Sequence, residues 1–208
     1  MAMRLALPIL LGALGACTVM TPPPEVVASP AMDWRSVATQ SDRERLRGWR
    51  TAFTQALADA RASGHGTVIA KEGALLVPDA ALGGGPIPNG RYRCRVIKLG
   101  GKSPGMLDYV AYPYFLCGID QQGRLQRFVK LTGSQRQVGR IYPADPLRQV
   151  FLGTLILGDE ERAMHYGFDR ERDVAGFVER IGPERWRIVM PWPHFESKLD
   201  VMELVPAS

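Results

Sequence analysis

The most constraining feature of this sequence is a series of short segments, from residue 90 to residue 206, in which apolar and polar residues alternate. Glycine and proline mark the connections, and none carries a helical pattern long enough for a crossover between parallel strands. Antiparallel strands in such a series leave exposed edges unless the sheet closes on itself. The sequence therefore predicts a mainly β fold, an antiparallel meander of about eight strands that closes into a small barrel or a curled sheet.

The alternation also predicts which side chains share a face. In the first segment Tyr92, Cys94 and Val96 lie on one side, and arginines lie on the other. Pro113 interrupts the second segment, so a bulge or a sheet edge is expected there. A tight connection is expected at 181–184. The expected strands cover residues 90–100, 109–120, 123–133, 136–145, 148–158, 173–182, 184–192 and 199–206.

One amphipathic helix is expected before the strands, over residues 41–63. Ser41 and Glu44 have the spacing of a capping box, and Gly64 is a natural stop. Apolar residues recur at three- and four-residue steps, which predicts a helix packed on the sheet. The stripe consists of Leu46, Trp49, Phe53, Leu57 and Ala60.

The N-terminus contains an apolar run over residues 5–16, preceded by Arg4. A bilayer span takes about 20 residues, so this run fits the core of a signal peptide better. It ends in Leu14-Gly15-Ala16-Cys17, which resembles the lipobox of bacterial lipoproteins. The resemblance implies that residues 1–16 are a signal peptide and that Cys17 becomes the acylated first residue. The alternatives are an ordinary signal peptide with an incidental Cys17, or a buried N-terminal helix.

Acylation at Cys17 would place the protein in the cell envelope. Two or more acyl chains, such as palmitate, anchor a protein stably, whereas a single chain binds marginally. Thr18 follows the cysteine. Lipoproteins that are retained in the inner membrane often carry aspartate at this position. The resemblance therefore implies the inner leaflet of the outer membrane, with the protein facing the periplasm.

Residues 17–32 are interpreted as the lipidated cysteine and a tether. The fifteen residues after Cys17 contain four prolines and almost no charge. A proline-rich chain extends about 3.1 Å per residue, so the tether would reach about 45 Å. Residues 33–208 are expected to form a single β-rich domain with the helix at its N-terminal side.

The expected location affects how the other two cysteines are interpreted. With Cys17 assigned to lipid, Cys94 and Cys117 remain as a pair in an oxidising compartment. They are expected to lie opposite each other on paired strands and to form a disulfide worth about 3 kcal/mol; two buried free thiols are the alternative. The net charge of +5 comes without a dense basic run, so no nucleic-acid partner is expected.

Several motifs are candidates for catalysis or metal binding. Ser103 lies in a G-x-S-x-G pattern, but strands flank it where a nucleophile elbow needs a strand and a helix. Glu161, His165 and Asp169 would share a helix face and bind metal only if Gly158 and Gly167 allowed a long helix.

Two further segments resemble functional motifs only in part. The glycine-rich 83–90 segment lacks the lysine and hydroxyl residues of a phosphate loop. His194 and Glu196 are near enough in sequence for acid–base work, but no nucleophile accompanies them. No catalytic residue, metal or cofactor is predicted.

Aromatic residues give the one indication of a binding surface. Side chains with an apolar body and a polar tip suit the mouth of a barrel or a partner surface, although they equally suit a core. The candidate ligand or partner surface consists of Tyr109, Tyr112, Tyr114, Trp186, Trp192 and His194.

Three longer stretches carry a family resemblance: 89–100, 129–160 and 176–206. Their order resembles an uncharacterised family of Gram-negative envelope lipoproteins (domain of unknown function 4893), over nearly everything after residue 33. The resemblance implies location only, because the family brings no activity. A weaker similarity links the chain to small periplasmic barrels that inhibit secreted metalloproteases.

These features lead to two functional hypotheses. The first is a non-catalytic envelope lipoprotein, anchored to the membrane, whose barrel binds a small lipophile, a glycan or an envelope protein. An inhibitor of a periplasmic hydrolase belongs with this class. The second is a cell-envelope hydrolase that works through His194 and Glu196 or through the acidic 159–173 region.

Overall fold

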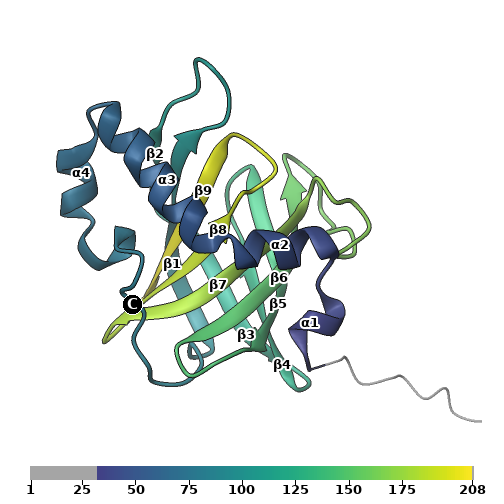
Figure 1. The fold of residues 1–208 in the computed structure, drawn as a ribbon. Helices are drawn as coiled ribbons and strands as arrows, with labels where there is room; N and C mark the ends of the chain where they lie inside the picture. Colours follow the sequence, from purple (N-terminus) through teal and green to yellow (C-terminus); the bar gives the residue numbers. More distant parts are fainter. Residues whose placement is uncertain (1–31, 208) are drawn as a thin grey trace, which may run out of the picture.

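The computed structural model describes residues 32–207. Cys17, the predicted signal peptide and nearly all of the predicted tether lie outside the described residues. Figure 1 shows a β-barrel whose outer surface is crossed by the N-terminal helices. Within residues 32–207, no helix has the length and apolar character that a membrane span requires.

The β-structure is one antiparallel meander. The strands are β1 (Gly90–Gly101), β2 (Tyr109–Ala111), β3 (Phe115–Gln122), β4 (Leu125–Lys130), β5 (Gln135–Pro143), β6 (Arg148–Leu157), β7 (Asp173–Gly182), β8 (Arg185–Pro191) and β9 (Ser197–Pro206). Each strand from β3 to β8 pairs with the next, and β1 pairs with both β3 and β9. The predicted barrel is therefore confirmed, with β1 and β3–β9 closed into a ring and β2 as an additional short strand.

Pro113 lies at a bulge, as its position in the sequence predicted. Ile97 pairs with Ala111 and Cys94 pairs with Phe115, so three residues of the second segment face two residues of β1. The extra residue splits the expected second strand into β2 and β3. A bulge of this kind bends the strand and leaves one residue outside the ladder, which suits a proline without an N–H.

The predicted disulfide between Cys94 and Cys117 is present, with a Cα–Cα distance of 5.9 Å. Its expected geometry was wrong in one respect, because the two cysteines are not directly opposite each other. Cys94 pairs with Phe115, and Cys117 pairs with Tyr92, so the bond runs diagonally between β1 and β3. Both side chains point into the barrel, where a diagonal pair still lies within the range that a disulfide spans.

Removing this disulfide is expected to lower the free energy of unfolding by about 3 kcal/mol. The bond closes a loop between residues separated by 23 positions, which restricts the unfolded chain. Chemical denaturation of the double variant Cys94→Ala/Cys117→Ala, beside the oxidised wild type, measures the difference. Equal unfolding midpoints and slopes for the two proteins would contradict the expectation.

The N-terminal helical region differs from the single helix predicted over 41–63. It contains α1 (Trp34–Val37), α2 (Gln40–Arg47), α3 (Trp49–Ala62), α4 (Gly66–Lys71) and the 3-10 helix η1 (Gly73–Leu76). The chain bends at Gly48 between α2 and α3, whose axes point in different directions in Figure 1. The bend lets α2 pack on β7 while α3 packs on β1 and β9 around the curved barrel.

The predicted capping residue was also wrong. Thr39 caps α2, because its hydroxyl accepts a hydrogen bond from the backbone N–H of Asp42. Ser41 lies inside the helix instead of before it. Gly64 has a φ of 87° just after α3, as expected of a C-terminal stop. The predicted apolar stripe faces the barrel, with four of its five residues buried and Trp49 half-buried.

Side chains fill most of the barrel interior. Phe128 and Phe151 meet edge to face with ring centroids 5.5 Å apart, and Met202 is fully buried beside them in the same cluster. A second cluster lies outside the barrel, between α3 and strands β1, β8 and β9. The apolar core therefore occupies two layers, one inside the sheet and one beneath the helices.

Arg187 lies on the outward face of β8 and is nevertheless fully buried. Its Nε donates to Glu179 Oε2 at 2.7 Å. Its remaining N–H groups donate to four backbone carbonyls in η1 and in the two residues that follow it. These are the carbonyls of Ala74, Leu75, Val77 and Pro78. One side chain thus fixes the 73–78 segment against the outer wall of the barrel.

Candidate functional site

Buried polar side chains occupy interior positions at one end of the barrel, the end where the loop joins β8 to β9. This end is uppermost in Figure 1. Lys98 continues the inward-facing series of Tyr92, Cys94 and Val96 along β1, and Lys130 follows the buried Phe128 along β4. Lys98 is 7% exposed and Lys130 is 4% exposed. The strand alternation that builds the apolar core therefore also carries two lysines into the interior at this end.

These lysines line a cavity of about 190 Å³. Its other lining residues are Val96, Tyr112, Phe115, Ser134, Gln135, Gln137 and Glu196. Tyr112, Ser134 and Glu196 are exposed residues, so the cavity reaches the surface between them. A second void of about 20 Å³ shares Lys98, Gln135 and Gln137 and has the size of one water molecule.

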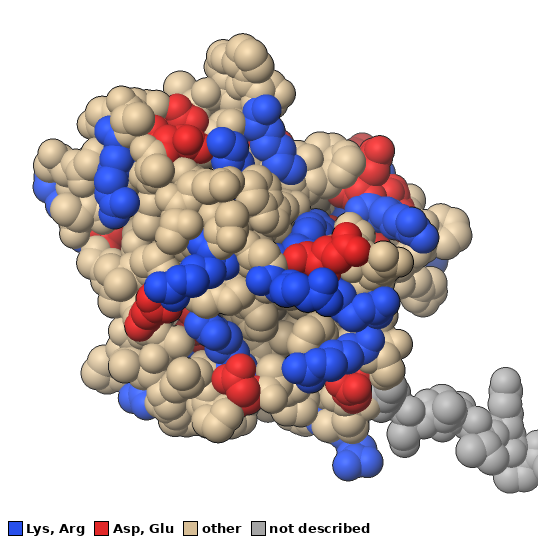
Figure 2. All heavy atoms as spheres, viewed as in Figure 1, with Lys and Arg blue, Asp and Glu red and all other residues tan. Residues whose placement is uncertain are grey.

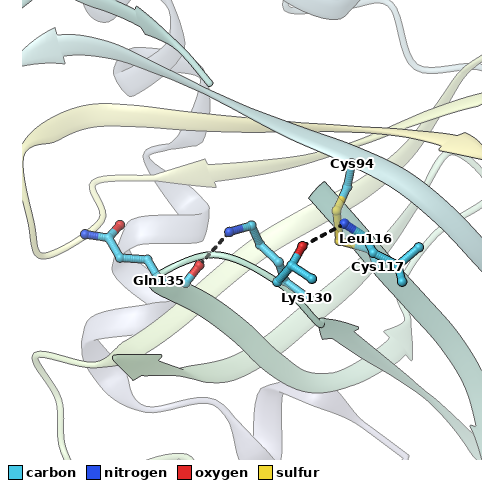
Figure 3. The surroundings of a disulfide bond; sticks show 6 residues. Cys94, Leu116, Cys117, Lys130 and Gln135 are labelled. Carbon is cyan, nitrogen blue, oxygen red and sulfur yellow. Dashed lines mark hydrogen bonds between the residues drawn. A yellow bond between two sulfur atoms is a disulfide. The ribbon is translucent and has the colours of Figure 1, made fainter. Parts of the chain in front are cut away.

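Lys130 lies deep in this cavity next to the disulfide, since it pairs with Cys117 across β3 and β4 (Figure 3). Its ammonium group donates to the carbonyl oxygen of Gln135 at 2.8 Å and lies 3.8 Å from the centre of the Phe115 ring. Within residues 32–207, no carboxylate lies in salt-bridge range of Lys130. A buried cation with one neutral acceptor is costly, so this group is a candidate for function.

Glycine at position 133 allows this arrangement. A Cβ there would lie 2.8 Å from Lys130 Nζ and 2.9 Å from Phe115 Cε1, and the residue has a φ of 93°. The turn after β4 can therefore fold closely over the ammonium group only with glycine at this position.

The surroundings of Lys130 disfavour its charged form. Burial is the main cause, and the nearby cations Arg136 and Lys98 add to it; together they lower the pKa of Lys130 to about 8. The amine therefore changes its charge near physiological pH, unlike an exposed lysine.

The surroundings of Lys98 favour its charged form. Burial tends to lower its pKa, but the carboxylates of Asp200 and Glu196, each 3.1 Å away, outweigh burial and hold the pKa of Lys98 above its usual value. Asp200 also accepts a hydrogen bond from the hydroxyl of Ser197. The site thus combines Lys98, which stays charged, with Lys130, whose charge changes near physiological pH.

Gln137 adds an unsatisfied acceptor. Its side-chain oxygen Oε1 is buried without a hydrogen-bond partner, and the residue is 4% exposed. A buried acceptor without a donor costs about 1–3 kcal/mol. A bound molecule with an N–H or O–H group, or a water molecule, would remove that cost.

The loop between β8 and β9 covers this end of the barrel. Trp192 has a φ of 48° and Glu196 a φ of 68°, a conformation that non-glycine residues adopt at a cost. The ammonium group of Lys102 donates to the carbonyls of Pro193 and His194, and the backbone N–H of Lys102 donates to Glu196 O. These bonds hold the carboxylate of Glu196, 45% exposed, against Lys98.

Charged groups outside the barrel are arranged differently. Arg50 pairs with Asp79 near the surface of α3, and Arg95 pairs with Glu203 on the outer wall. Figure 2 shows that lysine and arginine side chains on the helical face lie in separate groups, with acidic residues beside them. Lys130 differs from these surface cations because its partner is a neutral carbonyl.

The structure does not gather the six predicted aromatic and histidine positions into one surface. Tyr112 lines the lysine cavity, and His194 lines the small adjoining void. Trp192 lies in the covering loop beside Gly48, where a Cβ would be 3.5 Å from the indole nitrogen. These three positions surround the same end of the barrel.

The other three positions lie elsewhere. Tyr109 stacks on His65 and donates to Glu72, while Tyr114 donates to Glu203 on the outer wall. Trp186 lies inside the barrel near its opposite end, edge-on to Tyr92.

The candidate catalytic residues are separated as well. His194 lies 3.7 Å from Glu171, and Glu196 pairs with Lys98, so the two do not form an imidazole–carboxylate pair. Ser103 lies in the exposed connection between β1 and β2, where no helix follows it.

The acidic 159–173 region forms the connection between β6 and β7 and the start of β7. Glu160 and Asp169 both pair with Arg172. Over residues 32–207, no group of three or more histidine, cysteine or acidic side chains has a metal-binding arrangement.

A larger groove of about 830 Å³ lies at the opposite end of the barrel. There the 83–89 segment closes the barrel and satisfies the nearby polar groups. Gln126 donates to Ile87 O and Asn89 Oδ1, both at 2.7 Å, and Ile87 N donates to Gln149 Oε1. Since polar groups of the lysine cavity remain unsatisfied, that smaller cavity is the better candidate.

Lys98, Lys130 and Gln137 are not among the site residues predicted from the sequence. Extending the alternation of Tyr92, Cys94 and Val96 by one step would have placed Lys98 inside the barrel. Lys130, two residues after Phe128, carries the same signal. A charged residue at an interior position of a strand is therefore the pattern that could have located this site.

The sequence model of a family described as a domain of unknown function (DUF4893) matches residues 34–204. No curated protein and no solved structure matches the chain.

Proposed function

The chain belongs to the DUF4893 family, and we propose that its barrel is a non-catalytic binding module that takes a small organic anion into the lysine cavity. The observation that carries this proposal is Lys130, a buried amine whose protein partner is a neutral carbonyl. The bond to Gln135 O and the Phe115 ring occupy two sides of the ammonium group, which leaves an N–H donor for a ligand. A carboxylate there would convert an unpaired buried charge into an ion pair.

The size of the cavity narrows the ligand class. Phe128, Phe151 and Met202 fill the middle of the barrel, so the interior favours a short molecule over a long acyl chain. The cavity of about 190 Å³ lies below the common range of 300–1,000 Å³ for ligand pockets. A carboxylate of a few heavy atoms fits better than the lipophile or glycan expected from the aromatic residues.

The proposal is tested by calorimetric titration of the full chain, in detergent at pH 6.5, with acetate, propionate and acetamide. Acetate and propionate should bind, because Lys98 and Lys130 are both protonated at this pH. Acetamide has nearly the same shape without the charge and should not bind. Equal heats for acetate and acetamide would overturn the proposal.

Glu196 is expected to compete with the ligand for Lys98. The variant Glu196→Gln removes this resident carboxylate, and acetate affinity should rise up to about fivefold, in line with about 1 kcal/mol for an ion pair whose carboxylate is partly exposed. Glu184→Gln is the matched control, since Glu184 is exposed in the turn between β7 and β8 at the other end of the barrel. Unchanged or weaker acetate binding by Glu196→Gln would contradict this competition.

We also propose that the protein is an envelope lipoprotein, anchored through Cys17 and facing the periplasm from the outer membrane. The apolar run over residues 5–16 and the Leu14–Cys17 motif support this. Two acyl chains would hold the protein stably at the membrane.

Metabolic labelling with an alkyne fatty acid in a Gram-negative host tests the anchor. The wild type should incorporate label and fractionate with outer membranes, and Cys17→Ser should lose the label. An unlabelled wild type in the soluble fraction would refute the anchor without affecting the anion-binding proposal.

A further inference from the structure

We propose that the amine of Lys130 captures small carbonyl compounds as a reversible imine, and that the preferred compounds are short oxo acids carrying a carboxylate. This inference rests on the proposed function, because the same cavity must first admit the anion. It goes further by assigning Lys130 a covalent reaction.

The geometry around Lys130 suits a nucleophile. The amine lies at the wall of a cavity that reaches the surface past Tyr112 and Ser134, so a small molecule can approach it. One N–H is directed to Gln135 O, and the Phe115 ring covers another side of the group. The amine is therefore held in one place and screened from bulk water on the sides that the protein covers.

The protonation state of Lys130 supports this reactivity. With the pKa lowered to about 8, roughly one amine in five is neutral at pH 7.4, against about one in a thousand for an ordinary lysine. The same burial and neighbouring cations that disfavour the ammonium form thus raise the fraction that can attack a carbonyl carbon.

Lys98 has the complementary role of holding the carboxylate of the oxo acid. Its carboxylate partners Asp200 and Glu196 keep it charged, so it is a poor nucleophile. It retains one N–H donor beyond those two partners. The side-chain oxygen of Gln137 is available for the hydroxyl group of the tetrahedral intermediate.

The reaction balances without an external oxidant or reductant. The neutral amine nitrogen attacks the carbonyl carbon, and the carbon–oxygen π electrons move to oxygen, which gains the proton released by nitrogen. The resulting carbinolamine loses the hydroxyl group and a second nitrogen proton as water, which leaves a carbon–nitrogen double bond. Hydrolysis reverses both steps.

The test uses glyoxylate, an aldehyde with a carboxylate, and sodium cyanoborohydride to reduce any imine. The full chain in detergent is incubated at pH 7.4, digested and mapped by mass spectrometry. The sequence has five lysines, at 71, 98, 102, 130 and 198. The carboxymethyl group left by reduction should be at least tenfold enriched at Lys130 over Lys71, and also enriched over Lys102.

Lys102 is an informative internal control. Burial also lowers its pKa, but it is not among the residues lining the cavity. Comparable labelling of Lys102 and Lys130 would overturn the proposal, because reactivity would then follow basicity alone. So would labelling of Lys71 equal to that of Lys130.

The variant Lys130→Arg separates this inference from the proposed function. Arginine keeps the positive charge but does not form the imine, so acetate should still bind while the glyoxylate adduct disappears. Acetate binding by the wild type with no adduct at Lys130 would refute only the imine. Failure of both acetate binding and adduct formation would refute both proposals.

Discussion

Replacing Arg187 with methionine is expected to lower the free energy of unfolding by about 3–5 kcal/mol. The change leaves the buried carboxylate of Glu179 with Arg148 as its remaining cation, at 2.6 Å. It also removes the donors for the four carbonyls of the 74–78 segment. Unsatisfied buried acceptors are more costly than the loss of the hydrogen bonds alone suggests.

Denaturant titration measures this effect, with Arg91→Met as the matched control. Arg91 is an exposed arginine on β1, and its replacement should change the free energy of unfolding by about 0.5 kcal/mol or less. Arg187→Lys should fall between, because an ammonium group has fewer donors and a shorter reach. A loss below about 1 kcal/mol for Arg187→Met would show that the 73–78 segment does not depend on this side chain.

Replacing Lys130 with methionine is expected to weaken acetate binding at least tenfold and to stabilise the protein at the same time. Methionine fits the apolar wall formed with Phe115 and the disulfide, and it removes a buried cation whose partner is neutral. We expect a gain of about 1–3 kcal/mol at pH 7 and at least a tenfold loss of acetate affinity. A binding residue that reduces stability is typical of a functional site.

The pH dependence of this gain has a definite sign. The pKa of Lys130 is lower in the folded state than in the unfolded chain, so the unfolded state binds more protons between about pH 8 and pH 10.5. Wild-type stability should therefore rise relative to that of Lys130→Met across this window, and the gain should shrink.

Lys98 and Glu196 also line this cavity, Asp200 lines the adjoining void, and Arg136 is a further cation near Lys130. All four charged residues are present in both proteins. The difference between wild type and Lys130→Met isolates Lys130 from them. Lys71→Met, at an exposed position in α4, should show neither the gain nor the pH trend. A Lys130→Met protein less stable than wild type at pH 7 would contradict the account.

The barrel could be predicted from the sequence because strand alternation and turn residues are local signals. Pro113 indicated the bulge since it lacks an N–H, and Gly64 indicated the end of α3. The bend at Gly48 could not be predicted in this way. The apolar stripe continues from Leu46 to Trp49 across it, and only the curvature of the barrel requires two helices.

The pairing register of β1 and β3 could not be predicted from local sequence signals. The residues around Cys94 and Cys117 predicted that the cysteines meet, and they do. Their diagonal relation depends on where the bulge inserts its extra residue, at 112–114. Strand register is fixed by the whole hairpin, so it does not follow from the positions of two residues.

The candidate site could be predicted only in part, because a buried charged residue looks like an exception to the alternation of the strand. Arg187 and Lys130 both occupy positions that a simple alternation assigns to exposed or apolar residues. The burial of Arg187 depends on the distant 73–78 segment. Lys130 is bonded to a neutral carbonyl, because Glu196, which lines the same cavity, pairs with Lys98. The surroundings of both side chains are formed by residues far apart in the sequence, so local patterns do not predict them.

The most direct test of the binding proposal is an NMR pH titration of the Lys130 side chain, labelled with ¹³C at Cε, with and without acetate. The account predicts a midpoint near pH 8 for the free protein, because burial and nearby cations lower the pKa. Acetate should shift the midpoint upward, since it binds the charged amine. A midpoint near that of an exposed lysine, about 10.4, and unchanged by acetate would contradict the account.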